Sequence, residues 1–206
     1  MMKTTVAITA IFSLISFLYK FTLGVLTTSM VLMIAAISTL LVCIAKFAFL
    51  KNANKTRSQK KRAYLIIVIV TFIYGIIFIM FSILKAFNID TSNDKTYEGI
   101  WGGLFILVIF IMFILSCIKL KGALEKNDLM VIGLKEITFV SALTDLVIIE
   151  GFAYRIFLEY EDRFHDETVF LIDLIDRFTP LVISLLLIIV PVIMLIRYFK
   201  YQAEQA

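Results

Sequence analysis

The chain has 206 residues, of which 61% are apolar and 17% are charged. Soluble domains are about 45–50% apolar and about 25% charged, so a soluble domain of this length could not bury so much apolar surface. The net charge of +4 does not indicate nucleic-acid binding, because the basic residues stand in short segments beside apolar runs, where they orient a membrane protein. The composition therefore predicts an integral membrane protein whose main partner is the lipid bilayer.

Long apolar runs without alternating polar residues predict an all-α membrane protein rather than a barrel. Each run is close to the roughly 20 residues that a helix needs to cross a hydrocarbon core of about 30 Å. The first run lacks a small-residue cleavage site before Lys20, so we expect a retained transmembrane helix rather than a signal peptide. We expect one transmembrane domain over residues 1–206, with spans at about 4–20, 29–50, 63–87, 100–120, 129–154 and 178–199.

Three local signals refine the ends of these spans. A turn is expected over residues 21–28, where Gly24 can loosen the first helix. Residues 160–176 alternate apolar and acidic side chains, which predicts a short amphipathic helix along the outer surface. Pro180 would then lie in the first turn of the sixth span, where a missing N–H is harmless, and Pro191 would kink that span.

The charges between the spans predict the orientation of the chain. Residues 51–62 contain six basic side chains and no acid, which places this loop in the cytoplasm. Residues 119–127 and the tail at residues 197–206 are also basic, whereas residues 88–99 and 158–176 are mostly acidic. Six spans with both termini in the cytoplasm place every basic loop on one side, and we expect the membrane to be that of the cell.

The fifth span carries more charge than a lipid-facing helix should. It holds Lys135, Glu136, Asp145 and Glu150, with Asp145 near its middle. A carboxylate at that depth costs roughly 3 kcal/mol on insertion scales. This segment should therefore face protein or water rather than lipid, with the other helices packed around it.

Asp145 and Glu150 are the candidate ion-binding or proton-binding residues, and two interpretations of each stay open. A buried Asp145 can carry a proton or bind a cation, or it can form a structural ion pair with Lys20 or a hydrogen bond with a neighbouring Ser or Thr. Glu150 lies nearer the outer interface and can pair with a basic residue or reach the headgroups. Lys135 and Glu136, towards the inner side, are expected to snorkel or pair. Lys46 and Lys85 stand close to span ends and are expected to snorkel.

Nothing in the chain indicates an enzyme or a cofactor. It contains no GxSxG, P-loop or HExxH motif. Cys43 and Cys117 are single thiols inside apolar runs, and His165, the only histidine, falls in an outer loop. We therefore expect no catalytic residues, no metal and no cofactor.

Three stretches resemble the transmembrane domain of the cation diffusion facilitators, also called the cation efflux family. Residues 17–41 are similar to its first two helices, with Lys20, Gly24, Thr28 and Ser29 in the family's places. Residues 61–87 resemble its third helix, and residues 124–152 align with its fifth helix without a gap. The resemblance implies six helices, cytoplasmic termini, a homodimer and transport of a small cation or proton.

The resemblance also implies a metal site that this chain lacks. The family binds zinc or a similar ion between helices two and five, through pairs of Asp or His residues four apart. The equivalent positions here are Ser38 and Val42 on the second helix and Ile137 and Ser141 on the fifth. These side chains cannot form a tetrahedral zinc site. We also expect no counterpart of the family's cytoplasmic metal-binding domain after the sixth helix.

Two hypotheses for the function follow. The first is a divergent transporter-like membrane protein that moves a small cation or proton with Asp145. The second is a non-transporting scaffold or accessory subunit that retains the fold for helix association. A hydrated cavity at Asp145 favours the first, and a dry seam filled by side chains favours the second.

Overall fold

The computed structural model describes residues 2–26, 29–52, 56–87, 100–125, 128–159 and 166–203. These residues form helices and contain no strand, so the predicted all-α class with six helices is confirmed. The helices are α1 (Met2–Leu26), α2 (Met30–Asn52), α3 (Arg57–Ala86), α4 (Ile100–Leu124), α5 (Leu129–Glu159) and α6 (Asp166–Ala203).

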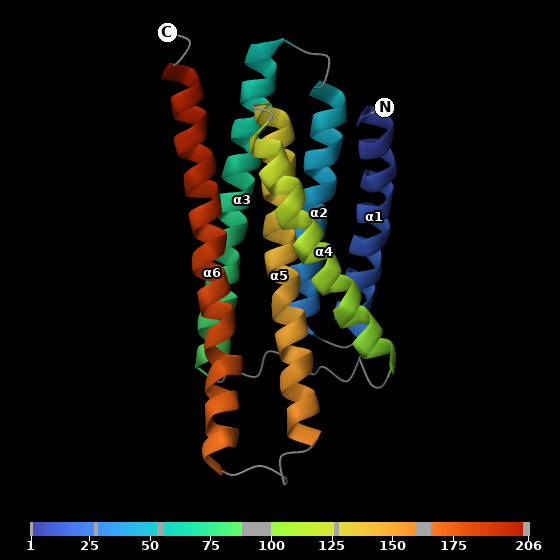
Figure 1. Cartoon of the computed structure of the whole chain (residues 1–206), viewed down its shortest axis with the longest axis vertical. Helices are drawn as coiled ribbons and strands as arrows, with labels where there is room; N and C mark the ends of the chain where they lie inside the picture. The colour runs from blue at the N-terminus through green and yellow to red at the C-terminus, as the bar shows by residue number, and fades with distance from the viewer. Residues whose placement is uncertain are drawn as a thin grey trace.

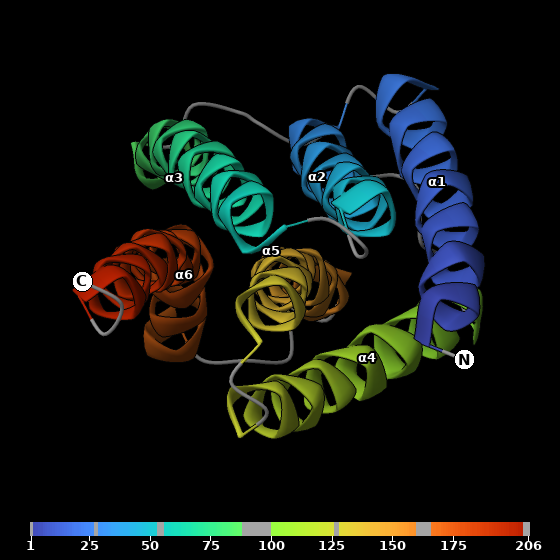
Figure 2. The ribbon, with the colours of Figure 1, turned by 90° about the horizontal axis from the view of Figure 1, so that it is seen from above.

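The six helices run alternately up and down, and both termini lie at the same end of the bundle (Figure 1). Seen along the bundle, α5 occupies the middle, with α2, α3, α4 and α6 around it (Figure 2). The first helix lies outside this group and packs along α2. The arrangement makes α5 the helix through which most of the others are connected.

Five of the helices are long and apolar enough to cross a membrane, which confirms the predicted class of integral membrane protein. They are α1, α2, α3, α4 and α6, and they expose large apolar side chains such as Phe12, Ile66, Met112 and Leu185. Among the described residues, α5 is not one of these five spans. None of the residues from Asp128 to Gly151 is exposed. As its charges predict, α5 faces protein.

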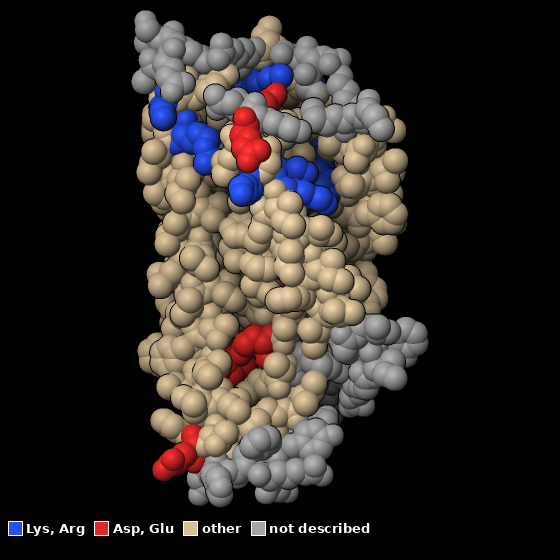
Figure 3. Space-filling view, viewed as in Figure 1, with Lys and Arg blue, Asp and Glu red and all other residues tan. Residues whose placement is uncertain are grey.

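Charged side chains collect towards the two ends of the bundle. In Figure 3 a band of Lys and Arg lies near the end that holds both termini, above a wide and almost uncharged belt. Acidic side chains appear within this band and again on the other side of the belt (Figure 3). The predicted acidic loop at residues 88–99 and the histidine His165 lie outside the described residues.

The turn expected at residues 21–28 is wrong for residues 21–26, because α1 continues through Lys20 and Gly24 to Leu26. Gly24 serves a different purpose from the one expected. A Cβ atom there would lie 2.9 Å from Met33 Cγ and 3.0 Å from Met33 N. The glycine therefore lets the end of α1 approach the start of α2 closely.

The separate amphipathic helix expected at residues 160–176 is also wrong where the chain is described. Residues 166–176 belong to α6 and continue without a break into the apolar part of that helix. Pro180 accordingly lies inside α6 and not in its first turn, and Pro191 lies inside it as expected. An acidic residue in this part of α6 does not have to face water. Asp176 is buried and pairs with Lys85 of α3.

Close packing of α3 on α6 depends on Gly75 and Pro191. A Cβ atom at Gly75 would lie 3.1 Å from the carbonyl oxygen of Leu187. Pro191 has no N–H to donate to that carbonyl, which stands four residues before it. The glycine thus allows α3 to lie against a turn of α6 that the proline has left with a free carbonyl.

Candidate functional site

Three carboxylates on α5 point into the bundle in two directions. An α-helix turns about 100° per residue. Asp145 stands nine residues after Glu136, so the two point about 180° apart, whereas Glu150 stands fourteen residues after Glu136 and points about 40° away from it. Asp145 therefore faces α1 and α2, and Glu136 and Glu150 face α3 and α6.

Asp145 forms a buried ion pair with Lys20 of α1. Lys20 Nζ lies 2.6 Å from Asp145 Oδ1 and also donates a hydrogen bond of 3.2 Å to Thr39 Oγ1 on α2. The two side chains are only 7% and 19% exposed. Of the two interpretations of Asp145, the structure shows the ion pair, in which one acid and one base neutralise each other and join α1, α2 and α5.

Ser38, Val42, Ile137 and Ser141, the four positions that the sequence resemblance aligns with metal ligands, lie between α2 and α5 and are filled by packed side chains. Ser38 donates to the carbonyl of Ala35, which leaves the Ser141 hydroxyl to donate across the seam to Ser38 at 3.2 Å. Val42 and Ile137 are buried in one apolar cluster. The seam is closed by packed side chains at this level, with Ser38 only 1% exposed.

Tyr74 of α3 extends the same polar seam. Its hydroxyl lies 2.9 Å from Thr144 Oγ1 on α5, and Thr144 in turn donates to the carbonyl of Val140. Tyr74 and Thr144 are both buried. These bonds satisfy the polar groups of the seam within the protein and leave none of them directed at a solute.

Glu136 forms a second cluster towards the end that holds the termini. Arg197 of α6 donates to Glu136 Oε1, and the Tyr64 hydroxyl of α3 lies 3.1 Å from Glu136 Oε2. The same Tyr64 hydroxyl lies 3.3 Å from the carbonyl oxygen of Met194. One acid and one base again neutralise each other, here between α3, α5 and α6.

Glu150 belongs to a third cluster, near the opposite end of the bundle. Lys85 Nζ of α3 lies 3.3 Å from Glu150 Oε2 and 2.7 Å from Asp176 Oδ1 of α6. Glu150 thus pairs with a basic residue, which was one of its two interpretations. Its other oxygen, Oε1, is buried without a hydrogen-bond partner.

Two lysines expected to snorkel are held inside the bundle instead. Lys85 is bound by the two carboxylates just described. Lys46 Nζ donates to the Thr9 carbonyl at 2.9 Å and to Ser13 Oγ at 2.5 Å, which ties α2 to α1. The snorkelling prediction is wrong for both residues because acceptors on neighbouring helices bind the two ammonium groups inside the bundle.

The sequence interpretation missed Arg197, Tyr64 and Asp176 as partners of the α5 carboxylates. Arg197 was assigned to the cytoplasmic tail and Asp176 to an outer segment. A usable signal was present, because each acid inside an apolar span requires a base at the same depth on another helix. Matching depths along the spans would have suggested Lys85 for Glu150 and Arg197 for Glu136.

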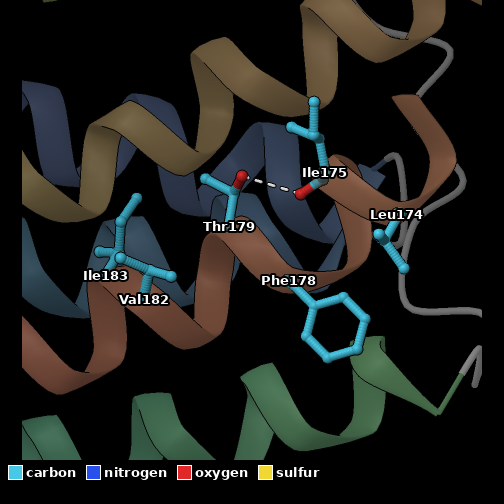
Figure 4. Close-up of a pocket in the computed structure, with 6 residues that line it drawn as sticks. All are labelled: Leu174, Ile175, Phe178, Thr179, Val182 and Ile183. Atoms are coloured by element: carbon cyan, nitrogen blue, oxygen red, sulfur yellow. Dashed lines mark hydrogen bonds between the residues drawn. The ribbon is translucent and has the colours of Figure 1, made fainter. Parts of the chain in front are cut away.

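No described group of three or more His, Cys, Asp or Glu residues could hold a metal ion. An apolar groove of about 340 Å³ lies on α6, lined by Leu174, Ile175, Phe178, Thr179, Val182 and Ile183 (Figure 4). Thr179, its polar residue, donates its hydroxyl to the Ile175 carbonyl at 2.8 Å. The groove lacks the convergent polar groups that orient a solute.

Comparison with known proteins adds no relative to this picture. No protein-family model matches the chain, and no match was found among curated proteins or among solved structures.

Proposed function

We propose that the chain is a six-span protein of the cell membrane that acts as a non-transporting scaffold or accessory subunit. The observation that carries this proposal is the closed seam between α2 and α5. Carriers need a hydrated binding site near the bilayer midplane that opens alternately to the two sides. Here that place holds the Ser38–Ser141 hydrogen bond and the Lys20–Asp145 ion pair.

The proposed topology places both termini in the cytoplasm. The helix α5 lies among five helices that are apolar enough to span the bilayer, so it crosses the membrane with them, shielded from lipid. The band of Lys and Arg near the end that holds the termini supports a cytoplasmic orientation of that end (Figure 3). No enzymatic activity is part of this proposal.

The proposed scaffold shares its arrangement of helices with the cation efflux family. The facing of Ser38 with Ser141 and the common cluster of Val42 and Ile137 support the register of α2 against α5 that the resemblance implies. Association of two copies, usual in that family, belongs to the proposal as well. In this view the scaffold remains and the metal ligands are replaced by packing residues.

A flux assay tests the absence of transport. The protein is reconstituted in vesicles that contain a pH dye or cation-sensitive dyes, with protein-free vesicles as reference. We expect no proton or cation flux above the reference for the wild type or for Asp145→Asn. A flux that Asp145→Asn abolishes would overturn the scaffold proposal.

Thiol labelling tests the closed seam directly. In a background of Cys43→Ala and Cys117→Ala, the variant Ser141→Cys should not react with a water-soluble maleimide. Ser58→Cys, at an exposed position of α3, should react fully as the matched control. Rapid labelling of Ser141→Cys would reveal a hydrated seam and argue for transport.

Movement of a proton or small cation is the second candidate function. One observation favours it, namely the surplus acid in the cluster of Lys85, Glu150 and Asp176. In the same vesicles, a flux that Glu150→Gln removes and Asp145→Asn preserves would assign transport to this cluster instead of the seam.

A further inference from the structure

The cluster of Lys85, Glu150 and Asp176 differs from the other buried ion pairs in its number of charges. Lys85 supplies one positive charge to two carboxylates, at 2.7 Å from Asp176 and 3.3 Å from Glu150. The side chains of Lys85, Glu150 and Asp176 are 12%, 15% and 11% exposed. A fully ionised cluster would therefore bury one uncompensated negative charge, which is strongly unfavourable in a bundle surrounded by lipid.

Among the side chains that the structure describes, the charged neighbours of this cluster pair with one another and do not supply the missing positive charge. On α6, Arg177 pairs with Asp173 at 2.5 Å. On α5, Tyr154 donates its hydroxyl to Asp173 at 3.0 Å. Among the described residues, the groups that act on Glu150 are Lys85 from α3 and Asp176 from α6.

The two carboxyl groups converge on one ammonium group. Lys85 Nζ lies 2.7 Å from Asp176 Oδ1 and 3.3 Å from Glu150 Oε2, and the two carboxyl groups also act on each other. Two carboxylates placed in this way repel each other, whereas a carboxylic acid donates its O–H to a carboxylate in a short, strong hydrogen bond. The unpartnered and buried Oε1 of Glu150 shows that the fully ionised arrangement leaves this group incompletely bonded.

We propose that Glu150, Asp176 and Lys85 form a proton-binding site that holds one proton between the two carboxyl groups. The proton comes from water at the end of the bundle opposite the termini, and it forms an O–H bond on one carboxyl that is donated to the other. The cluster then has no net charge. Acidic side chains are visible in a recess between α5 and α6 (Figure 3).

The bound proton links pH to the packing of α3, α5 and α6. The folded protein holds the proton at a pH where the unfolded chain, with both carboxyl groups in water, has released it. Stability therefore falls as the pH rises, by about a tenfold change in the folding equilibrium constant per pH unit in the range where one proton is released on unfolding. This inference does not depend on whether the protein transports anything.

Infrared spectroscopy of the full chain in detergent micelles detects the proton directly. We expect the carbonyl-stretch band of a buried carboxylic acid at neutral pH, lost in both Glu150→Gln and Asp176→Asn. The matched control Glu136→Gln should keep the band, because Glu136 has Arg197 to itself. A wild type without the band, or a band that survives both variants, would overturn the proposal.

Unfolding measured across the pH range provides the second test. The wild type and Glu136→Gln should lose stability as the pH rises from 5 to 8, by about tenfold per pH unit where the proton is released, and Glu150→Gln should lose this dependence. If Glu150→Gln does not fold, Asp176→Asn serves the same purpose. Equal pH dependence in all variants would show that the cluster is not its source and would reject the proton site. Stabilisation at high pH by added sodium or potassium would show that the cluster binds a metal cation, and would also reject the proton site.

Failure of this inference is distinguishable from failure of the proposed function. The infrared band and the pH dependence report on the cluster whether or not flux is observed. Absence of both with no flux would reject the proton site and leave the scaffold intact. Presence of both with a flux that Glu150→Gln abolishes would retain the site and replace the scaffold with a transporter.

Discussion

Two buried ionic clusters on the same helix, centred on Asp145 and Glu150, differ by a single carboxylate. Asp145 meets one lysine, Lys20, and the charges balance. Glu150 shares Lys85 with Asp176, so two acids meet one base and the charges do not balance. The comparison shows that the balance of acids and bases, more than the depth of burial, decides whether a buried cluster only joins helices or can also bind an ion. A balanced pair fixes helices together, and an unbalanced one takes up an ion.

Removal of the lysine from the balanced pair should have the largest effect. Lys20→Met leaves Asp145 buried and unpaired, which costs about 3–5 kcal/mol. The free energy of unfolding, measured by titration with a denaturing detergent, checks this loss. The double variant Lys20→Met/Asp145→Leu should recover most of the loss, because an apolar pair replaces the ionic one. A Lys20→Met protein as stable as the wild type would show that the pair contributes little.

Addition of an acid to the balanced pair should make it resemble the other cluster. Thr39→Asp places a second carboxylate beside Lys20, where Thr39 Oγ1 now accepts a bond of 3.2 Å. We expect a loss of about 3 kcal/mol at neutral pH, which shrinks as the pH falls because the folded state takes up a proton.

The control for this added charge is Thr39→Asn, because an asparagine side chain has the shape of an aspartate without its charge. It should be destabilised less and should show no new pH dependence. If both variants respond to pH in the same way, charge balance is not what separates the two clusters.

The third cluster, at Glu136, extends the comparison to a balanced group that depends on close packing. A Cβ atom at Gly133 would lie 2.7 Å from Tyr64 Cδ2. Gly133→Ala should therefore displace the Tyr64 ring from Glu136 and destabilise the protein by about 1–3 kcal/mol. Thermal unfolding in micelles measures the effect.

Gly122 provides a matched control on α4, because a Cβ atom there would meet nothing within 4 Å. Gly122→Ala should be neutral or stabilising by up to about 1 kcal/mol, through helix propensity alone. Equal destabilisation by the two alanines would mean that the contact with Tyr64 does not matter.

The uncharged part of the seam should give the smallest effect. Ser38→Ala removes the hydrogen bond to Ser141, and such bonds between membrane helices contribute about 0.6 kcal/mol. A double-mutant cycle with Ser141→Ala measures the coupling between the two hydroxyls. A coupling of several kcal/mol would show that the seam, and not the ion pairs, holds α2 to α5.

Hydropathy was sufficient to predict the fold class but not the ends of the helices. The apolar runs fixed the number and order of the helices, and the charges of α5 predicted its central place. The prediction failed at residues 21–26 and 166–176, where polar or small residues lie inside helices. A hydropathy average treats Lys20 and Asp176 as signs of water, although each is buried against a partner on another helix.

The candidate site was predictable only where the sequence itself restricted the partners. Lys20 was named as one of the partners open to Asp145, beside a Ser or Thr of a neighbouring helix, and the structure shows the ion pair with Lys20. Asp176 and Arg197 were not found because they were assigned to an outer segment and to a tail, where charges need no partner. Side-chain pairing between helices depends on depth and rotation together, and both require the helix ends that hydropathy misplaced.

The Lys20–Asp145 ion pair also has a consequence for the order of synthesis. The two residues are 125 positions apart in the chain. At about 5–20 residues per second, roughly 6–25 s pass between the synthesis of Lys20 and that of Asp145. During this interval the newly made first helix carries a cationic side chain whose counter-ion does not yet exist. The first helix can pack along α2 soon after both are made, but its ion pair with α5 can form only at a late step of biogenesis.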